Sequence, residues 1–231
     1  VEVDGKYYVV VDVEVTEENT FEPAKPVSDD DDDNDDNGGE EEQQPQGAEA
    51  TLDKDGKLTI TGGSGTLNEE TIEKLLSENP NWISTVTTLD LSQSGYTQIG
   101  KSDDTAITGV FASCTSLKTV ILPTSLESIG NNAFAESGLT EINLSGCTSL
   151  RSIGDGAFWN CTSLEEINLS DCINLTSIGG SAFESCEKLT TVTLPSTVTT
   201  IGNSAFWYCT SLTSITLPAG LHTIGNSAVR N

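Results

Sequence analysis

One pattern, I-G-x-x-A-F, returns through the second half of the chain and limits what this chain can fold into. The Ile-Gly pairs follow one another at steps of 24, 25, 23 and 23 residues, at Ile129, Ile153, Ile178, Ile201 and Ile224. A Phe column keeps a similar spacing, at Phe111, Phe134, Phe158, Phe183 and Phe206, and Val229 takes the Phe place in the last copy. A repeat of this length is typical of a leucine-rich solenoid, in which each unit buries its apolar edge only against its neighbours.

Each unit also contains the pattern L-x-x-[I/V]-x-L, which predicts a short strand. Copies begin at Leu117, Leu139, Leu164, Leu189 and Leu212, and an earlier version is Val86/Leu89/Leu91. The last two apolar residues are two apart, so both side chains point inward, and stacked copies would pair as a parallel sheet. Pro ends the strand after Leu122, Leu194 and Leu217, because it has no N–H to donate. The Gly of each Ile-Gly pair predicts a second corner, with a positive φ or a close approach of backbones.

The combined pattern, L-x-x-I-x-L-P-x-x-[L/V]-x-x-I-G-x-x-A-F-x-x-C-x-S-L, resembles the BspA-type leucine-rich repeat family over about Val86–Val229. The copies Leu139–Leu150 and Leu164–Leu175 are also similar to cysteine-containing leucine-rich repeats. The resemblance implies a secreted or surface-anchored bacterial protein that is used in adhesion or host contact and has no enzyme activity. The family has no fixed set of binding residues, so none is transferred to this chain.

A cap is expected before the repeats. Residues 48–84 predict a hairpin around Asp53–Lys57, then a bend at Gly62–Gly65, then a helix that Asn68 caps and Asn79-Pro80 ends. The bend lacks the Lys-Ser/Thr ending of a phosphate-binding loop. Trp82 and Ile83 are expected to lead into the first repeat strand. The predicted fold is therefore a mostly-β α+β solenoid: about six leucine-rich coils with parallel strands in residues 85–231, behind a hairpin-helix cap, with Lys101–Gly109 looping out.

Two further segments precede the cap. Residues 1–21 predict a β-hairpin or strand segment, with Asp4-Gly5 as the turn. Residues 22–47 predict an acidic linker. Within the linker, Asp33, Asp35 and Asn37 match the first half of a calcium loop, but Gln44 stands where the bidentate Glu is needed. A plain spacer, loose cation condensation and a Ca²⁺ site all remain open, and no other cofactor is indicated.

The charge of the chain excludes one class of partner. The formal net charge is -26, and residues 1–47 alone hold 17 acidic and two basic residues. A chain this acidic repels nucleic acid. There is no Met, the first residue is Val, and neither a signal peptide nor a stretch long enough to span a membrane is visible, so any signal or anchor is expected outside this chain.

All six cysteines lie in the repeats, in two columns. Cys114, Cys161, Cys186 and Cys209 follow the column Phe by three residues, and Cys147 and Cys172 follow the last strand Leu by three. Buried free thiols are the favoured interpretation. Disulfides between neighbouring coils are the alternative, and metal binding is the least favoured, because no C-x-x-C pair exists and His222 is the only His.

Two groups of residues are candidates for binding. The outward strand positions form a polar ladder with an acidic middle, in which Glu141, Asn143, Glu166 and Asn168 stand out. Trp159 and the Trp207-Tyr208 pair directly follow column Phe residues, where Ala135 and Glu184 show that the coil needs no aromatic side chain. These residues would suit sugar stacking or a protein anchor. Ordinary strand chemistry and shielding of the coil are the alternatives for the two groups.

The sequence thus predicts no enzyme, since it contains no nucleophile motif and no catalytic constellation. It favours a secreted or surface-displayed binding module that contacts a protein or glycan of a host or neighbouring cell. A structural stalk of a larger surface protein and a calcium-dependent assembly element are the alternatives.

Overall fold

The computed structural model describes residues 2–3, 6–7, 47–100 and 109–230. Two short strands, β1 (Glu2–Val3) and β2 (Lys6–Tyr7), pair antiparallel, as the predicted hairpin requires. The rest of segment 1–21 and the linker as far as residue 46 lie outside the described residues, as does the loop at 101–108. The predicted calcium-loop residues Asp33, Asp35 and Asn37 therefore lie outside them too.

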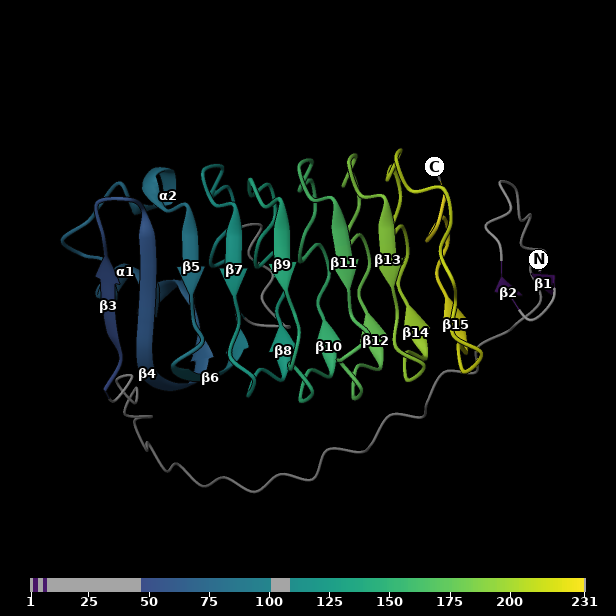
Figure 1. Ribbon diagram of the computed structural model, residues 1–231, viewed down its shortest axis with the longest axis horizontal. Helices are drawn as coiled ribbons and strands as arrows, with labels where there is room; N and C mark the ends of the chain where they lie inside the picture. Colours follow the sequence, from purple (N-terminus) through teal and green to yellow (C-terminus); the bar gives the residue numbers. More distant parts are fainter. Residues whose placement is uncertain (1, 4–5, 8–46, 101–108, 231) are drawn as a thin grey trace, which may run out of the picture.

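Residues 47–100 and 109–230 form a solenoid whose coils follow one another along a single axis, and Figure 1 shows its strands in two rows. One row holds the L-x-x-[I/V]-x-L strands: β5 (Thr88–Asp90), β7 (Thr119–Ile121), β9 (Glu141–Asn143), β11 (Glu166–Asn168) and β13 (Thr191–Thr193). The other holds the Ile-Gly strands: β6 (Ser94–Ile99), β8 (Ser128–Ile129), β10 (Ser152–Ile153), β12 (Ser177–Ile178), β14 (Thr200–Ile201) and β15 (Thr223–Ile224). The predicted parallel leucine-rich solenoid is confirmed.

Register follows the sequence columns. Leu89 pairs with Val120 and Val120 with Ile142 in one row, while Ile153 pairs with both Ile129 and Ile178 in the other. The sixth copy departs from the prediction, because Leu212 and Ile215 are buried but the segment forms no strand.

The column Phe side chains lie fully inside the solenoid. Their five rings stack from coil to coil with centroids 5.5, 5.5, 5.2 and 5.2 Å apart and planes within 11° of parallel. Parallel-displaced rings are a favoured arrangement, and each Phe buries a large apolar area. The ring column therefore provides much of the core that neighbouring coils share.

The N-terminal cap is built from β3 (Glu49–Leu52), β4 (Lys57–Leu67) and two helices. The first part of β4 pairs with β5 and its last part with β6, so one long strand begins both rows. The Asn68 side chain accepts the Thr71 N–H at 2.9 Å and starts α1 (Glu69–Leu75), as its capping role predicts.

Two expectations for the cap were wrong. Gly62–Gly65 is no bend, but a bulged part of strand β4 against β6. Its glycines are needed because the Tyr96 ring fills the place of a Gly63 side chain. Helix α1 ends at Leu75, before Asn79-Pro80. Trp82 and Ile83 do lead into the first repeat strand, and they do so through a second short helix, α2 (Trp82–Thr85).

The corner glycines follow both predicted routes. Gly100 has a positive φ of 70°. At Gly154, Gly179, Gly202 and Gly225 the reason is close approach, because an added Cβ would meet backbone atoms of the preceding coil. Positive φ values fall instead on two other columns, which consist mostly of Asn and Ser. They are the residue two after the corner Gly and the residue two after the column Phe, and include Asn132, Gly156, Ser181, Asn160, Ser185 and Tyr208.

Candidate binding site

The predicted strand-ladder residues Asn143 and Asn168 form turns. Asn143 Oδ1 accepts the backbone N–H of Ser145 at 2.9 Å and its hydroxyl at 2.6 Å. Asn168 Oδ1 accepts the Ser170 N–H at 3.0 Å. Asp90 makes the same contacts with Ser92 in the first coil. These Asx turns end the strand in the copies that have no Pro after the last Leu, so local structure accounts for both Asn residues.

The acidic ladder residues Glu141 and Glu166 are exposed on β9 and β11. Glu141 accepts a long hydrogen bond of 3.4 Å from the Thr119 hydroxyl. A small hollow of about 90 Å³ beside these strands brings Asn143 and Asn168 together, but neither glutamate lines it. The four ladder residues thus share a face without forming one pocket.

The candidate aromatic residues lie on a different part of the coil. Trp159, Glu184 and Trp207 each follow a column Phe, and we call these three positions on consecutive coils the aromatic column. The backbone holds them in register, because the N–H of Asn160 donates to Glu184 O at 2.8 Å and the N–H of Ser185 donates to Trp207 O at 2.8 Å. Both indoles are 38% exposed, so each is only partly used in packing.

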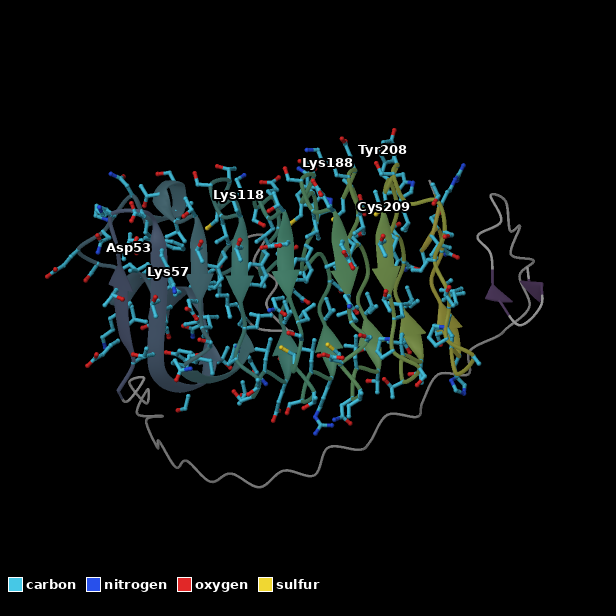
Figure 2. The ribbon with its side chains drawn as sticks, in the orientation of Figure 1. Asp53, Lys57, Lys118, Lys188, Tyr208 and Cys209 are labelled. Atoms are coloured by element: carbon cyan, nitrogen blue, oxygen red, sulfur yellow. The ribbon has the colours of Figure 1, made fainter. Side chains whose placement is uncertain are left out.

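Tyr208 extends the aromatic column at its C-terminal end. Its ring meets that of Trp207 edge-on, with centroids 5.7 Å apart and planes at 89°. The side chain is 53% exposed, and Figure 2 shows Tyr208 at the outer rim of the solenoid. Its φ of 61° is left-handed, a conformation that is unfavourable for a bulky residue. The same column holds Ser113, Glu136, Asn160 and Ser185 in earlier coils, so Tyr208 is the one aromatic residue there.

A groove of about 430 Å³ opens beside Trp159, and we call it the glycine groove. It runs over four consecutive coils, since its lining comes from Asn131 and Asn132, then Asp155, Gly156 and Trp159, then Gly180, Ser181 and Glu184, then Asn203. The groove lies where two glycines on neighbouring coils, Gly156 and Gly180, take the places that hold Asn, Asp or Ser in the other coils that line it. The sequence analysis identified only Trp159 of this lining as a candidate.

Side chains stabilise one wall of the glycine groove by bridging coils. Asn131 Oδ1 accepts the Asp155 N–H at 2.9 Å, Asp155 Oδ1 accepts the Gly180 N–H at 2.6 Å, and Asn203 Oδ1 accepts the Asn226 N–H at 2.8 Å. This amide ladder (Asn131, Asp155, Gly180, Asn203, Asn226) is interrupted only at Gly180, which has no side chain. Aligning the residue after each corner Gly would have revealed the gap.

The six cysteines are free and buried, as the favoured interpretation predicts. In the longer column the thiols of Cys161, Cys186 and Cys209 donate to backbone carbonyls of the preceding coil at 3.1 to 3.3 Å. Burial raises the pKa of Cys161 to about 11 and that of Cys209 to about 12. These thiols are structural, since the thiolate is the reactive form and burial suppresses it.

The repeat geometry agrees with a known family. A family model described as the BspA type leucine rich repeat region matches six copies in this chain, over residues 86–209 and 147–231. The chain belongs to the BspA-type leucine-rich repeat family. A comparison with curated proteins finds no match.

Solved structures of leucine-rich repeat proteins are similar to this chain. A leucine-rich repeat protein from Bacteroides ovatus is 20% identical, with a TM-score of 0.51, over 77% of this chain and 54% of its own. A leucine rich cell surface protein from Faecalibacterium prausnitzii is 24% identical over 79% of this chain and 50% of its own, with a TM-score of 0.43. This chain thus spans about half the length of these two proteins. The likeness to the Bacteroides ovatus protein, at 20% identity, shows the fold alone.

The described residues hold few other functional features. In these ranges no helix is long and apolar enough to cross a bilayer. The same part of the chain contains no group of three or more His, Cys, Asp or Glu side chains that could hold a metal ion.

Proposed function

We propose that this chain is a non-enzymatic binding module of a secreted or surface-displayed bacterial protein, which contacts a protein or glycan of a host or neighbouring cell through its aromatic column. One observation carries the proposal: Trp159, Trp207 and Tyr208 are substantially exposed at positions where other coils carry Ala, Glu or Ser. The solenoid fold does not need these side chains, so another selective reason is required.

The surroundings of the aromatic column support binding. Trp and Tyr are the side chains that most often dominate interface energies, because they bury much area at low entropic cost. Here they stand on a backbone that hydrogen bonds tie from coil to coil. A rigid support reduces the entropy that is lost on binding. The left-handed backbone that Tyr208 shares with the rest of its column is unfavourable for a bulky side chain, so stability does not explain a Tyr at this position.

The proposed surface location is supported by membership of the BspA-type family. The alternative of a purely structural stalk predicts that the aromatic residues are interchangeable with the Ala and Ser of other coils. A binding module predicts that their loss removes affinity while the solenoid stays folded.

The test compares the chain with its Trp159→Ala, Trp207→Ala double variant on an array of glycans and host proteins. Ile173→Ala provides a matched control, since Ile173 is 58% exposed but lies outside the aromatic column. We expect a ligand that binds the chain and the Ile173 variant and binds the double variant at least about tenfold more weakly. Equal binding by all three proteins would remove the aromatic column as the site.

A further inference from the structure

We propose that the glycine groove binds a neutral, unbranched oligosaccharide that lies along the solenoid axis and extends from Trp159 toward Trp207. This inference rests on the proposed binding function and assigns a ligand class to one part of the aromatic surface.

The size and floor of the groove suit such a ligand. Its volume of about 430 Å³ lies within the range of small-ligand sites. Backbone forms the floor, because Gly156 and Gly180 carry no side chains, so a ligand can approach the main chain closely. Hydrogen bonds between neighbouring coils, such as Gly156 N–H to Gly180 O at 2.8 Å, hold this floor rigid.

The chemistry of the walls matches a sugar. Trp159 offers an aromatic face to the C–H groups of a pyranose ring. Asp155 and Glu184 offer carboxylate oxygens to its hydroxyl groups, and Asp155 is oriented because its Oδ1 already accepts the Gly180 N–H at 2.6 Å. Hydrogen bonds to an ionised acceptor are the stronger ones. The site therefore combines one apolar platform with fixed polar partners on either side.

The negative charge of the groove and of the chain favours neutral oligosaccharides over anionic ones. Among the described residues that line the groove none is Lys, Arg or His, whereas two are acidic. The chain as a whole has a net charge of -26. A sulfated, phosphorylated or sialylated glycan would be repelled by both the local and the overall field.

Spacing favours a ligand that itself repeats. Neighbouring coils are 5.2 Å apart at the stacked Phe rings in this region, so Trp159 and Trp207 stand two such steps apart, about 10 Å, with Glu184 between them. The sugar units of an extended oligosaccharide also follow one another at about the spacing of neighbouring coils. A peptide strand finds less to bind here, because the backbone groups of these turns already pair between coils, as in Phe158 N–H to Ala182 O at 2.8 Å.

The closing experiment uses Gly180→Asn. The Asn side chain would fill the groove and also complete the amide ladder. An added Cβ at Gly180 would lie 3.3 Å from Asn203 O, a tight contact that requires the backbone to shift by a few tenths of an ångström. Gly220→Asn is the matched control, since Gly220 lies outside the groove and an added Cβ there meets only Ser196 O at 3.5 Å. Thermal unfolding of both variants is measured as well, so that a loss of binding by a folded Gly180→Asn chain is assigned to the filled groove.

The probes are neutral β-linked glucose, N-acetylglucosamine, galactose and mannose chains, from disaccharide to hexasaccharide, measured by calorimetry. We expect at least one series to bind more tightly with length. Gly180→Asn should weaken binding about tenfold or more, and Trp207→Ala should weaken only the longer chains. Binding of none of these series overturns the inference, as does tighter binding of a sulfated analogue or full binding by Gly180→Asn. If Gly180→Asn retains a ligand that the double Trp variant loses, the groove is wrong but the proposed function stands.

Discussion

The indole ring of Trp82 meets the ring of Phe111 edge-on, with centroids 6.1 Å apart and planes at 84°. Phe111 is the first of the five stacked rings, so Trp82, from the short helix α2, covers the end of the column that faces the cap. Edge-to-face contact is a favoured aromatic geometry. The cap and the repeats thus share one continuous aromatic core, although the cap sequence lacks the repeat pattern.

Replacing Trp82 should uncouple the cap from the first coil. Trp82 is only 8% exposed, so Trp82→Ala is expected to lower the free energy of unfolding by about 3–5 kcal/mol. Urea unfolding followed by circular dichroism measures this loss. Trp159→Ala should cost less than Trp82→Ala, because at 38% exposure part of its side chain already lies in water. Similar losses in the two variants would contradict the capping role.

The predicted site residue Asn143 should prove structural. Asn143→Ala removes the acceptor of two hydrogen bonds from Ser145 and is expected to cost about 1 kcal/mol of stability. Asn143→Asp should retain most of it, because Asp90 makes the same turn in the first coil. Thermal unfolding of both variants checks this. An Asp variant as unstable as the Ala variant would argue against the turn.

The repeat columns were predictable because every coil imposes the same demand on the same position. Ile142, Leu144 and Cys161 could be placed inward from spacing, and all three are buried. The function of Asn143 was not predictable from its type, since Asn serves both ligands and turns. The informative signal was local: a Ser two residues on and no Pro after the strand Leu.

The glycine groove was harder to predict because it depends on two columns on neighbouring coils. Gly156 is the second residue after its corner Gly, whereas Gly180 is the first residue after its own. Only the stacking of coils brings the two glycines together beside Trp159. The prediction for the glycine run in β4 was wrong for a similar reason. A bend was expected because nothing local reveals that β6 and the Tyr96 ring lie against these residues.

The buried thiols should make the solenoid sensitive to alkali. Burial raises the pKa of Cys114, Cys172 and Cys209 to about 12 and that of Cys147 and Cys161 to about 11, against 9.0 for a free thiol. The folded chain therefore keeps protons that the unfolded chain releases. This stability is fully present below about pH 8.5 and is lost as pH rises toward the folded values, by about 1.4 kcal/mol per pH unit for each thiol.

Urea midpoints measured between pH 7 and pH 10 test the thiol linkage. We expect little change up to about pH 8 and a steep fall above pH 9, because the thiols together can offset the whole stability of a typical domain. Burial also raises the pKa of Cys186 well above its usual value. Cys186→Ala should therefore make the free energy of unfolding fall less steeply with pH, by the contribution of about one proton. A midpoint that does not move up to pH 10 would show that the thiols are accessible in the folded chain.

Completing the amide ladder should stabilise the array. In Gly180→Asn the new side chain can accept the Asn203 N–H as Asn203 accepts that of Asn226, and an added hydrogen bond contributes about 0.5–1.5 kcal/mol. Gly202→Asn is the matched negative control, because its Cβ would overlap the backbone of Gly179 and Gly180. Differential scanning calorimetry should rank Gly180→Asn above the parent chain and Gly202→Asn below it. The reverse order would contradict the ladder.

Replacing Tyr208 by Asn should keep or raise the stability of the chain and weaken its binding. A left-handed backbone costs an L-residue about 1–2 kcal/mol, and Asn tolerates it better, as Asn160 does at φ 57° in the same column. Tyr208→Asn loses the edge-on contact with Trp207, but a contact this exposed contributes toward the low end of about 0.5–1.5 kcal/mol. The variant should therefore be as stable as the parent chain or more stable by up to about 1 kcal/mol, yet bind the array ligand more weakly. Ser185→Asn, at φ 60°, is the control that gains stability without altering binding. A Tyr208→Asn chain that unfolds much more easily would make Tyr208 a packing residue, and its strain would then need no functional reason.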